Sequence, residues 1–226
     1  TKRTNSMMSQ KTKANWQLAK NKRRATGNFL LQVACCLLAV FFLACSPTKH
    51  IREGDALYTG AKVNLSADSV TARQKKVLNA DLEGLTRPRP NSRFLGIPFK
   101  LMIYNFFNAD SSTSFFGKLG KKFGEPPVLA SSVDLDANVE LLQSHLHSKG
   151  FFGAAVTADS TWKNKKASVT YTANAGPQYK MASVEFVNDS SRLAQAISDI
   201  SKETLLKIGA PYDLGLIKGE RTRIDA

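Results

Sequence analysis

The sequence predicts an α+β fold in which tandem units of β-α-α-β-β order follow an N-terminal apolar signal helix. Three observations predict it. Residues 29–44 form a single apolar run close to the N-terminus. Residues 132–173 change from a helical period to a strand period, and the order of elements that begins at residue 57 begins again at residue 179.

The apolar run FLLQVACCLLAVFFLA, at 29–44, follows a positively charged stretch at 20–24. A helix of this length spans about 24 Å, which is less than the hydrocarbon core of about 30 Å. Such a length favours a signal peptide over a stable membrane span. The run ends at Ala44-Cys45, and a polar sequence follows directly.

Phe42-Leu43-Ala44-Cys45 resembles a lipobox, in which a small residue precedes a cysteine that receives a thioether-linked diacylglycerol. The resemblance implies that residues 1–45 are a lipoprotein signal peptide and that Cys45 is the site of lipid attachment. Phe42 departs from the usual Leu, Ile or Val at its position. Two alternatives stay open, namely a signal anchor held in the inner membrane and an ordinary cleaved signal. All three predict export.

The net charge of +14 would suit a nucleic-acid-binding protein if it were spread over the chain. However, the first 44 residues contain eight Lys and Arg and no acidic residue, whereas the chain from Cys45 onward has 24 basic and 18 acidic residues. The excess positive charge therefore lies largely in the signal segment, and we expect no nucleic-acid partner. All three cysteines also lie near this segment, which excludes a disulfide framework.

Residues 46–56 are expected to form a polar tether, followed by a strand at 57–65 and a helix at 67–82. Proline-rich sequence then opens an insertion at 84–131, with seven basic and two acidic residues and a strongly apolar part at 94–107. This apolar part is expected either to dock on a partner or membrane surface, or to close over the first sheet.

A helix is predicted from Ser132 or Asp134, both suitable N-caps, to Gly150, a suitable C-terminal stop. Its apolar stripe has spacings of four, three and four residues and consists of Leu135, Val139, Leu142 and Leu146.

Two strands at 153–162 and 166–173 are expected to form a hairpin with a turn at Asn164-Lys165. A further strand at 179–187, a helix at 193–200 and a helix from Asp213 are predicted after it.

Three segments in the same order resemble polypeptide-transport-associated (POTRA) domains of BamA/TamA-type bacterial outer-membrane proteins. They are LLQSHLHSKGFFGAAV at 141–156, VTYTANAGPQYKMASVEF at 169–186 and LKIGAPYDLGLIKGERTRI at 206–224. The resemblance implies a first POTRA-like domain at 57–176 and a second, truncated one at 177–226. Together with the lipobox, PRPNSRFLGIPFKLMIYNFF at 88–107 is similar to the lipoprotein TamA-like branch of Bacteroidetes-type bacteria.

This resemblance implies a periplasmic module of an outer-membrane protein assembly or translocation factor, anchored through its lipid on the periplasmic face. Its expected partners are unfolded outer-membrane protein clients and a periplasm-spanning, TamB-like protein. The chain would then be an N-terminal fragment, and a C-terminal barrel would lie beyond it. The rival interpretation is a single-span inner-membrane POTRA protein with a division or scaffold role, as in FtsQ-like proteins.

In a β-α-α-β-β unit the last strand lies beside the first, so the penultimate strand lies at an edge where an extended client can pair with it. The residues predicted to bind a partner in this way are Gly153, Ala154, Ala155, Val156, Thr157, Ala158, Asp159 and Ser160. The alternative is a solvated edge that Lys163, Lys165 and Lys166 protect from pairing.

No catalytic site, metal site or cofactor is predicted, because GxSxG, HExxH, P-loop and GxGxxG motifs are absent from the sequence. His145 and His147 would point about 200° apart on a helix and cannot share a metal ion. An exported enzyme is therefore the weakest of the three interpretations. Trp162 and Tyr171 are interpreted as packing partners across the hairpin, and Glu220 as part of a solvated helix face.

Overall fold

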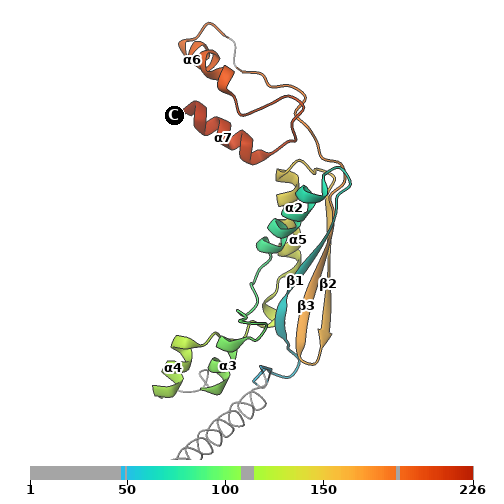
Figure 1. The fold of residues 1–226 in the computed structure, drawn as a ribbon, viewed down its shortest axis with the longest axis vertical. Helices are drawn as coiled ribbons and strands as arrows, with labels where there is room; N and C mark the ends of the chain where they lie inside the picture. Colours follow the sequence, from blue (N-terminus) through green and yellow to red (C-terminus); the bar gives the residue numbers. More distant parts are fainter. Residues whose placement is uncertain (1–46, 49, 108–114, 187–188, 226) are drawn as a thin grey trace, which may run out of the picture.

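The computed structural model describes residues 47–48, 50–107, 115–186 and 189–225. Cys45 and the predicted signal peptide lie outside these residues. The described part of the chain contains no helix that is both long and apolar enough to cross a membrane. Along the long axis of the molecule, the insertion lies at one end, the sheet in the middle and residues 189–225 at the other end (Figure 1).

The sheet consists of β1 (Leu57–Ser66), β2 (Ala155–Lys163) and β3 (Lys166–Asn174) in the order β1-β3-β2. β3 pairs parallel to β1 and antiparallel to β2. The last strand therefore lies beside the first and the penultimate strand lies at an edge. The predicted α+β class and the β-α-α-β-β order of the first unit are confirmed.

The turn between β2 and β3 has left-handed backbone at both of its central residues. Asn164 has φ 52° and Lys165 has φ 56°. Two consecutive residues with positive φ define the type I′ turn, whose twist matches that of the flanking strands. The predicted two-residue hairpin is thus confirmed, and its tight turn fixes the pairing of Lys163 with Lys166.

Two helices, α2 (Ala72–Leu85) and α5 (Leu135–Ser148), pack on one face of the sheet (Figure 1). The start predicted for α2 was too early, because Thr71 is its N-cap and forms a capping box with Gln74. α5 is capped by Asp134, whose side chain accepts from Ala137 N at 2.9 Å. Gly150, with φ 86°, follows the C-cap as predicted.

The core lies between these helices and the inner face of the sheet. Leu82, Leu142 and Leu146 are fully buried against it. Each such side chain contributes about 1.5–3 kcal/mol relative to an exposed position. The facing strand residues are Tyr58, Val63, Leu65, Val169, Tyr171 and Ala173. The opposite face of the sheet carries exposed polar side chains, so the sheet is covered on one side.

The insertion between α2 and α5 contains α3 (Phe99–Phe106) and α4 (Phe115–Phe123). Buried asparagines fix the two segments that join it to the core. Asn91 Nδ2 donates to Pro126 O at 2.7 Å, and Asn91 Oδ1 accepts from Val128 N at 2.9 Å. Asn138 on α5 donates to Arg87 O and accepts from Arg87 N, at 2.6 and 2.7 Å.

Residues 189–225 form α6 (Arg192–Ile200), a short 3-10 turn (Ser201–Glu203) and α7 (Leu214–Asp225). The helices agree with the prediction, but the predicted strand at 179–187 is wrong over its described residues. Tyr179 and Met181 exchange backbone hydrogen bonds with residues 209–212, which gives one isolated bridge. Among the described residues no further strand lies beside this segment, and a strand without a ladder partner does not persist.

Candidate functional site

The sheet has two edges, and the edge formed by β1 is covered by its own chain. Tyr58 N donates to Val128 O at 2.8 Å, where the returning end of the insertion runs beside the first half of β1. Farther along the strand, Val63 N donates to a carboxylate oxygen of Glu83 on α2 at 3.3 Å. At Tyr58 and Val63 the N–H groups that could pair with an additional strand are therefore already satisfied.

The edge formed by β2 is open. Because Lys163 and Lys166 flank a two-residue turn, their backbone groups bond to each other, and every second residue of β2 likewise bonds to β3. The backbone groups of the intervening residues point away from the sheet. These residues are Val156, Ala158, Ser160 and Trp162. Within the described part of the chain, no backbone group is recorded as their partner on the outer side.

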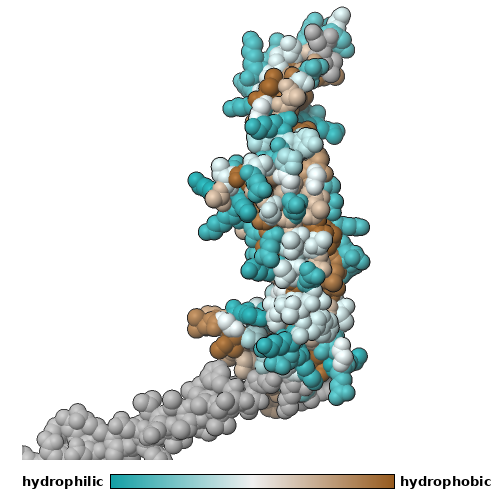
Figure 2. All heavy atoms as spheres, turned by 90° about the vertical axis from the view of Figure 1, so that its right-hand side faces the viewer, coloured by the Kyte–Doolittle hydropathy of each residue, from teal (hydrophilic) through white to brown (hydrophobic). Residues whose placement is uncertain are grey.

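Side chains on β2 become more exposed along the strand. Val156 is buried under α5 and Ala158 is half-buried, whereas residues 159–163 are exposed on both faces. Figure 2 faces this side of the molecule, where residues of near-neutral hydropathy predominate along the middle. An extended segment can thus approach the second half of β2 without displacing a packed element.

The sequence placed the candidate binding segment slightly too early. Gly153 and Ala154 precede β2, and Ala154 is buried. Of the residues predicted to bind, those from Ala155 to Ser160 lie on the strand. The observed strand ends at Lys163, one residue beyond the predicted end at Trp162. From the sequence, Trp162 was assigned to packing and Lys163 to protection of the edge.

Trp162 was the clearest error among the predicted packing residues. It faces Ala167 across the hairpin, not Tyr171, which pairs with Ala158. Trp162 is 54% exposed, whereas Tyr171 is fully buried. The alternation of β2 puts Trp162 on the core face, next to the turn at 164–165. α2 and α5 end short of that end of the hairpin (Figure 1).

A hollow of about 370 Å³ lies beside Trp162. Residues 53–56 form one wall of it and residues 162–166 the other. In this hollow the hydrogen bond from the Ser131 hydroxyl holds the pKa of the Asp55 carboxyl below its usual range. Apolar ring surface and lysine ammonium groups thus lie together at the end of the open edge.

The described residues contain no group of three or more His, Cys, Asp or Glu side chains that could hold a metal ion. Burial lowers the pKa of His145 on α5, which keeps its ring neutral within the helix packing.

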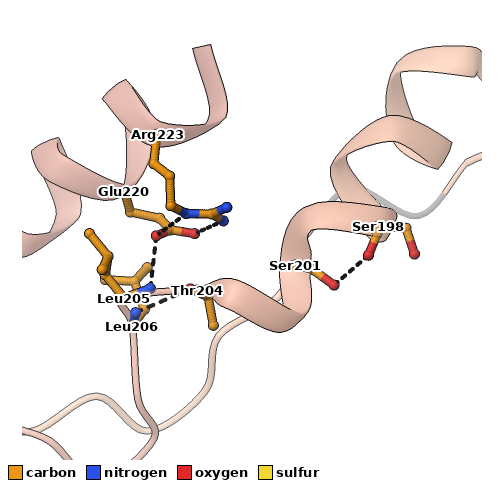
Figure 3. A network of polar contacts seen from close by, with 7 residues as sticks. All are labelled: Ser198, Ser201, Thr204, Leu205, Leu206, Glu220 and Arg223. Carbon is orange, nitrogen blue, oxygen red and sulfur yellow. Dashed lines mark hydrogen bonds and ion pairs between the residues drawn. The ribbon is translucent and has the colours of Figure 1, made fainter. Parts of the chain in front are cut away.

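Glu220 on α7 is buried, which corrects its interpretation as part of a solvated face. Its carboxylate accepts from Leu205 N at 2.9 Å and from Arg223 Nη2 at 2.7 Å (Figure 3). The hydrogen bond from Arg223 lowers the pKa of Glu220 to about 2. This network ties the loop after the 3-10 turn to α7, so its role is structural.

No protein-family model and no curated protein matches the chain. Among solved structures, the crystal structure of Haemophilus influenzae BamA POTRA3-5 is similar, with 14% identity and a TM-score of 0.28 over 78% of this chain and 88% of that one. A likeness this loose says nothing about activity. The strand order and the difference between the two edges are seen directly in this structure and do not depend on that likeness.

Proposed function

We propose that residues 57–174 form a POTRA-type polypeptide-binding module of a factor for outer-membrane protein assembly or translocation. The observation that carries this proposal is the asymmetry of the sheet, in which β1 is covered and β2 is open. A non-enzymatic module that handles unfolded chains needs such an edge, because main-chain hydrogen bonds provide affinity without demanding a particular sequence.

In the proposed mechanism an extended client segment pairs with the outward backbone groups of β2. Pairing begins over residues 159–163, where both faces of the strand are exposed. The exposed ring of Trp162 offers an apolar anchor next to the turn. Lys163, Lys165 and Lys166 favour acidic residues in the client and discourage pairing between two copies of this edge.

The cellular location is part of the same proposal. A lipid on Cys45 would hold the module on the periplasmic face of the outer membrane, as in the lipoprotein TamA-like branch. Clients would be unfolded outer-membrane proteins, and the partner would be a periplasm-spanning, TamB-like protein. These expectations rest on the resemblance of the segments at 42–45, 88–107, 141–156, 169–186 and 206–224 to that family.

Site-specific photocrosslinking of the full chain tests the binding edge. We expect a benzophenone amino acid in place of Asp159 on β2 to capture an unfolded barrel-forming protein, and the same group in place of Asn64 on β1 to capture little. In a second arm, Ser160→Pro should reduce binding about tenfold, because it removes one outward N–H from the edge. Ser160→Ala keeps that N–H and should bind like the wild type. Equal capture from both edges would contradict the proposal.

Metabolic labelling with an alkyne-bearing palmitate analogue tests the lipid anchor. The wild-type chain should be labelled in the bacterial envelope, and Cys45→Ala should lose the label completely. Cys35→Ala is the matched control, because it removes a neighbouring thiol and should keep the label. An unlabelled wild-type chain would remove the lipoprotein part of the proposal and leave the binding edge untouched.

A further inference from the structure

Within the helical hairpin of the insertion, α4 has its glycines inside and its aromatic residues outside. α4 buries Gly117 and Gly120, whereas Phe115, Phe116 and Phe123 are 72%, 61% and 55% exposed. A helix of a soluble domain normally turns its aromatic side chains inward. The exposed rings of α4 therefore mark a surface that functions in contact with something apolar.

The backbone of α3 comes close to the chain at Gly124, directly after α4. A Cβ atom added to Gly124 at the end of α4 would lie 2.7 Å from Tyr104 N on α3, so no larger residue fits there. Gly124 N donates to Gly120 O at 2.7 Å, and Glu125 N donates to Lys100 O at 3.1 Å. With the inner side filled by backbone, the rings of α4 have only the outer side available.

Three of the rings in this hairpin are in contact with one another. Phe107, the residue after α3, stacks on Phe116 with ring centroids 6.2 Å apart, and Phe115 meets Phe116 edge-on at 5.9 Å. These rings are thus held by mutual contacts and not as isolated surface residues. Phe94, Leu95 and Phe99, from the segment before α3 and its first turn, are also exposed.

Positive charge accompanies these rings. Lys118, Lys121 and Lys122 lie on α4 and Lys100 lies on α3, all exposed. Glu125 is the one acidic side chain among the described residues of the insertion, and the Ser92 backbone N–H and hydroxyl already donate to it. Aromatic rings bordered by lysines, without a free acid among the described residues, match the interface of an anionic phospholipid membrane.

The hairpin also lies next to the predicted lipid attachment point. Asn105 Nδ2 on α3 donates to Pro47 O at 3.2 Å. Pro47 is two residues from Cys45, and two residues of chain span at most about 7 Å. Figure 1 shows α3 and α4 at the end of the molecule opposite α6 and α7, and Figure 2 shows apolar residues at that end.

We propose that the α3–α4 hairpin is a membrane-surface binding element whose partner is an anionic phospholipid leaflet. The phenylalanine rings enter the interface between headgroups and acyl chains, and the lysines pair with lipid phosphates. The inference rests on the side chains of α3 and α4 and does not require the client-binding edge. It gives the insertion at 84–131 a role separate from that of the sheet.

Tryptophan fluorescence of the full chain on vesicles tests this inference. In a background with Trp16→Phe and Trp162→Phe, Phe115→Trp places a reporter on the patch and Thr157→Trp places a control on the exposed face of the sheet. With vesicles that contain phosphatidylglycerol and brominated acyl chains, the patch reporter should shift to the blue and lose at least half of its intensity. The control reporter should show neither the blue shift nor the loss of intensity.

Sedimentation with the vesicles separates the possible failures. If the chain sediments with the vesicles but the patch reporter is not quenched, the membrane role of the hairpin is overturned even though the chain is attached. If the reporter is shielded from aqueous iodide without any vesicles, another protein surface covers the patch, which also overturns the proposal.

Charge reversal gives the matched variant. Lys118→Glu combined with Lys121→Glu should reduce the quenching on phosphatidylglycerol vesicles several-fold, with unchanged circular dichroism. On phosphatidylcholine vesicles the same variant and its parent should show equally weak quenching. Equal quenching of both proteins on both kinds of vesicle would show that charge has no part in binding and would overturn the choice of an anionic surface.

Discussion

The two edges of this small sheet differ because the returning end of the insertion forms hydrogen bonds with β1 and not with β2. As it returns to the core at Val128, the insertion pairs with the first half of β1, and no segment among the described residues does the same beside β2. Both strands belong to the same three-stranded sheet and both have exposed polar outer faces. The comparison shows that an insertion can cover part of one edge of a sheet and leave the other edge free for a further strand.

The largest effect is expected from proline substitutions that compare two neighbouring residues of β2. Thr161→Pro removes an N–H that points toward β3 and should lower the free energy of unfolding by at least about 2 kcal/mol. Ser160→Pro removes an outward N–H and should cost less than about 1 kcal/mol. Urea denaturation followed by circular dichroism measures both. Similar losses would mean that the outward groups of β2 are assigned to the wrong residues.

A second variant opens the covered edge. Asn91→Ala removes both hydrogen bonds that hold the returning end of the insertion, and should destabilise the protein by about 1–2 kcal/mol. Hydrogen exchange at Tyr58 N should accelerate about tenfold as β1 becomes accessible. Lys76→Ala, which affects an exposed side chain on α2, is the control and should leave this exchange unchanged.

The smallest effect concerns α7, away from both edges. Because the folded-state pKa of Glu220 is about 2, below its ordinary value of 4.5, its ion pair stabilises the α7 contact fully above pH 4.5 and loses this contribution as the pH falls through about 2. The amide shift of Leu205 should titrate with that midpoint in nuclear magnetic resonance spectra. Glu220→Gln should abolish the titration, and the amides of β2 should not follow it in either protein.

Local patterns predicted those elements of the fold whose determinants lie close together in sequence. The period-two alternation at 166–173, the Asp134 cap and the Asn164-Lys165 turn each depend on a few neighbouring residues. The predicted strand at 179–187 failed because a strand depends on a partner elsewhere in the chain. Local apolar character therefore identified the segment as extended but not as part of a ladder.

The candidate site was predicted only in outline, for a related reason. Topology places the penultimate strand at the edge, but the length of β2 that remains uncovered depends on where α2 and α5 end above it. By the alternation of β2, Trp162 lies on the core face of the sheet, but it stays exposed because no helix among the described residues covers it. Glu220 resembles a surface residue in sequence and is buried because Leu205 and Arg223 supply its hydrogen bonds. Such outcomes depend on tertiary contacts that residue type alone does not reveal.

The double hydrogen bond between Asn138 and Arg87 has a mechanical consequence. It joins the first residues of the insertion to α5 through two short bonds, side by side, in a buried position. A force on the helical hairpin would load both bonds together instead of breaking them one after the other. The start of the insertion is therefore held to α5 more firmly than either hydrogen bond alone would hold it.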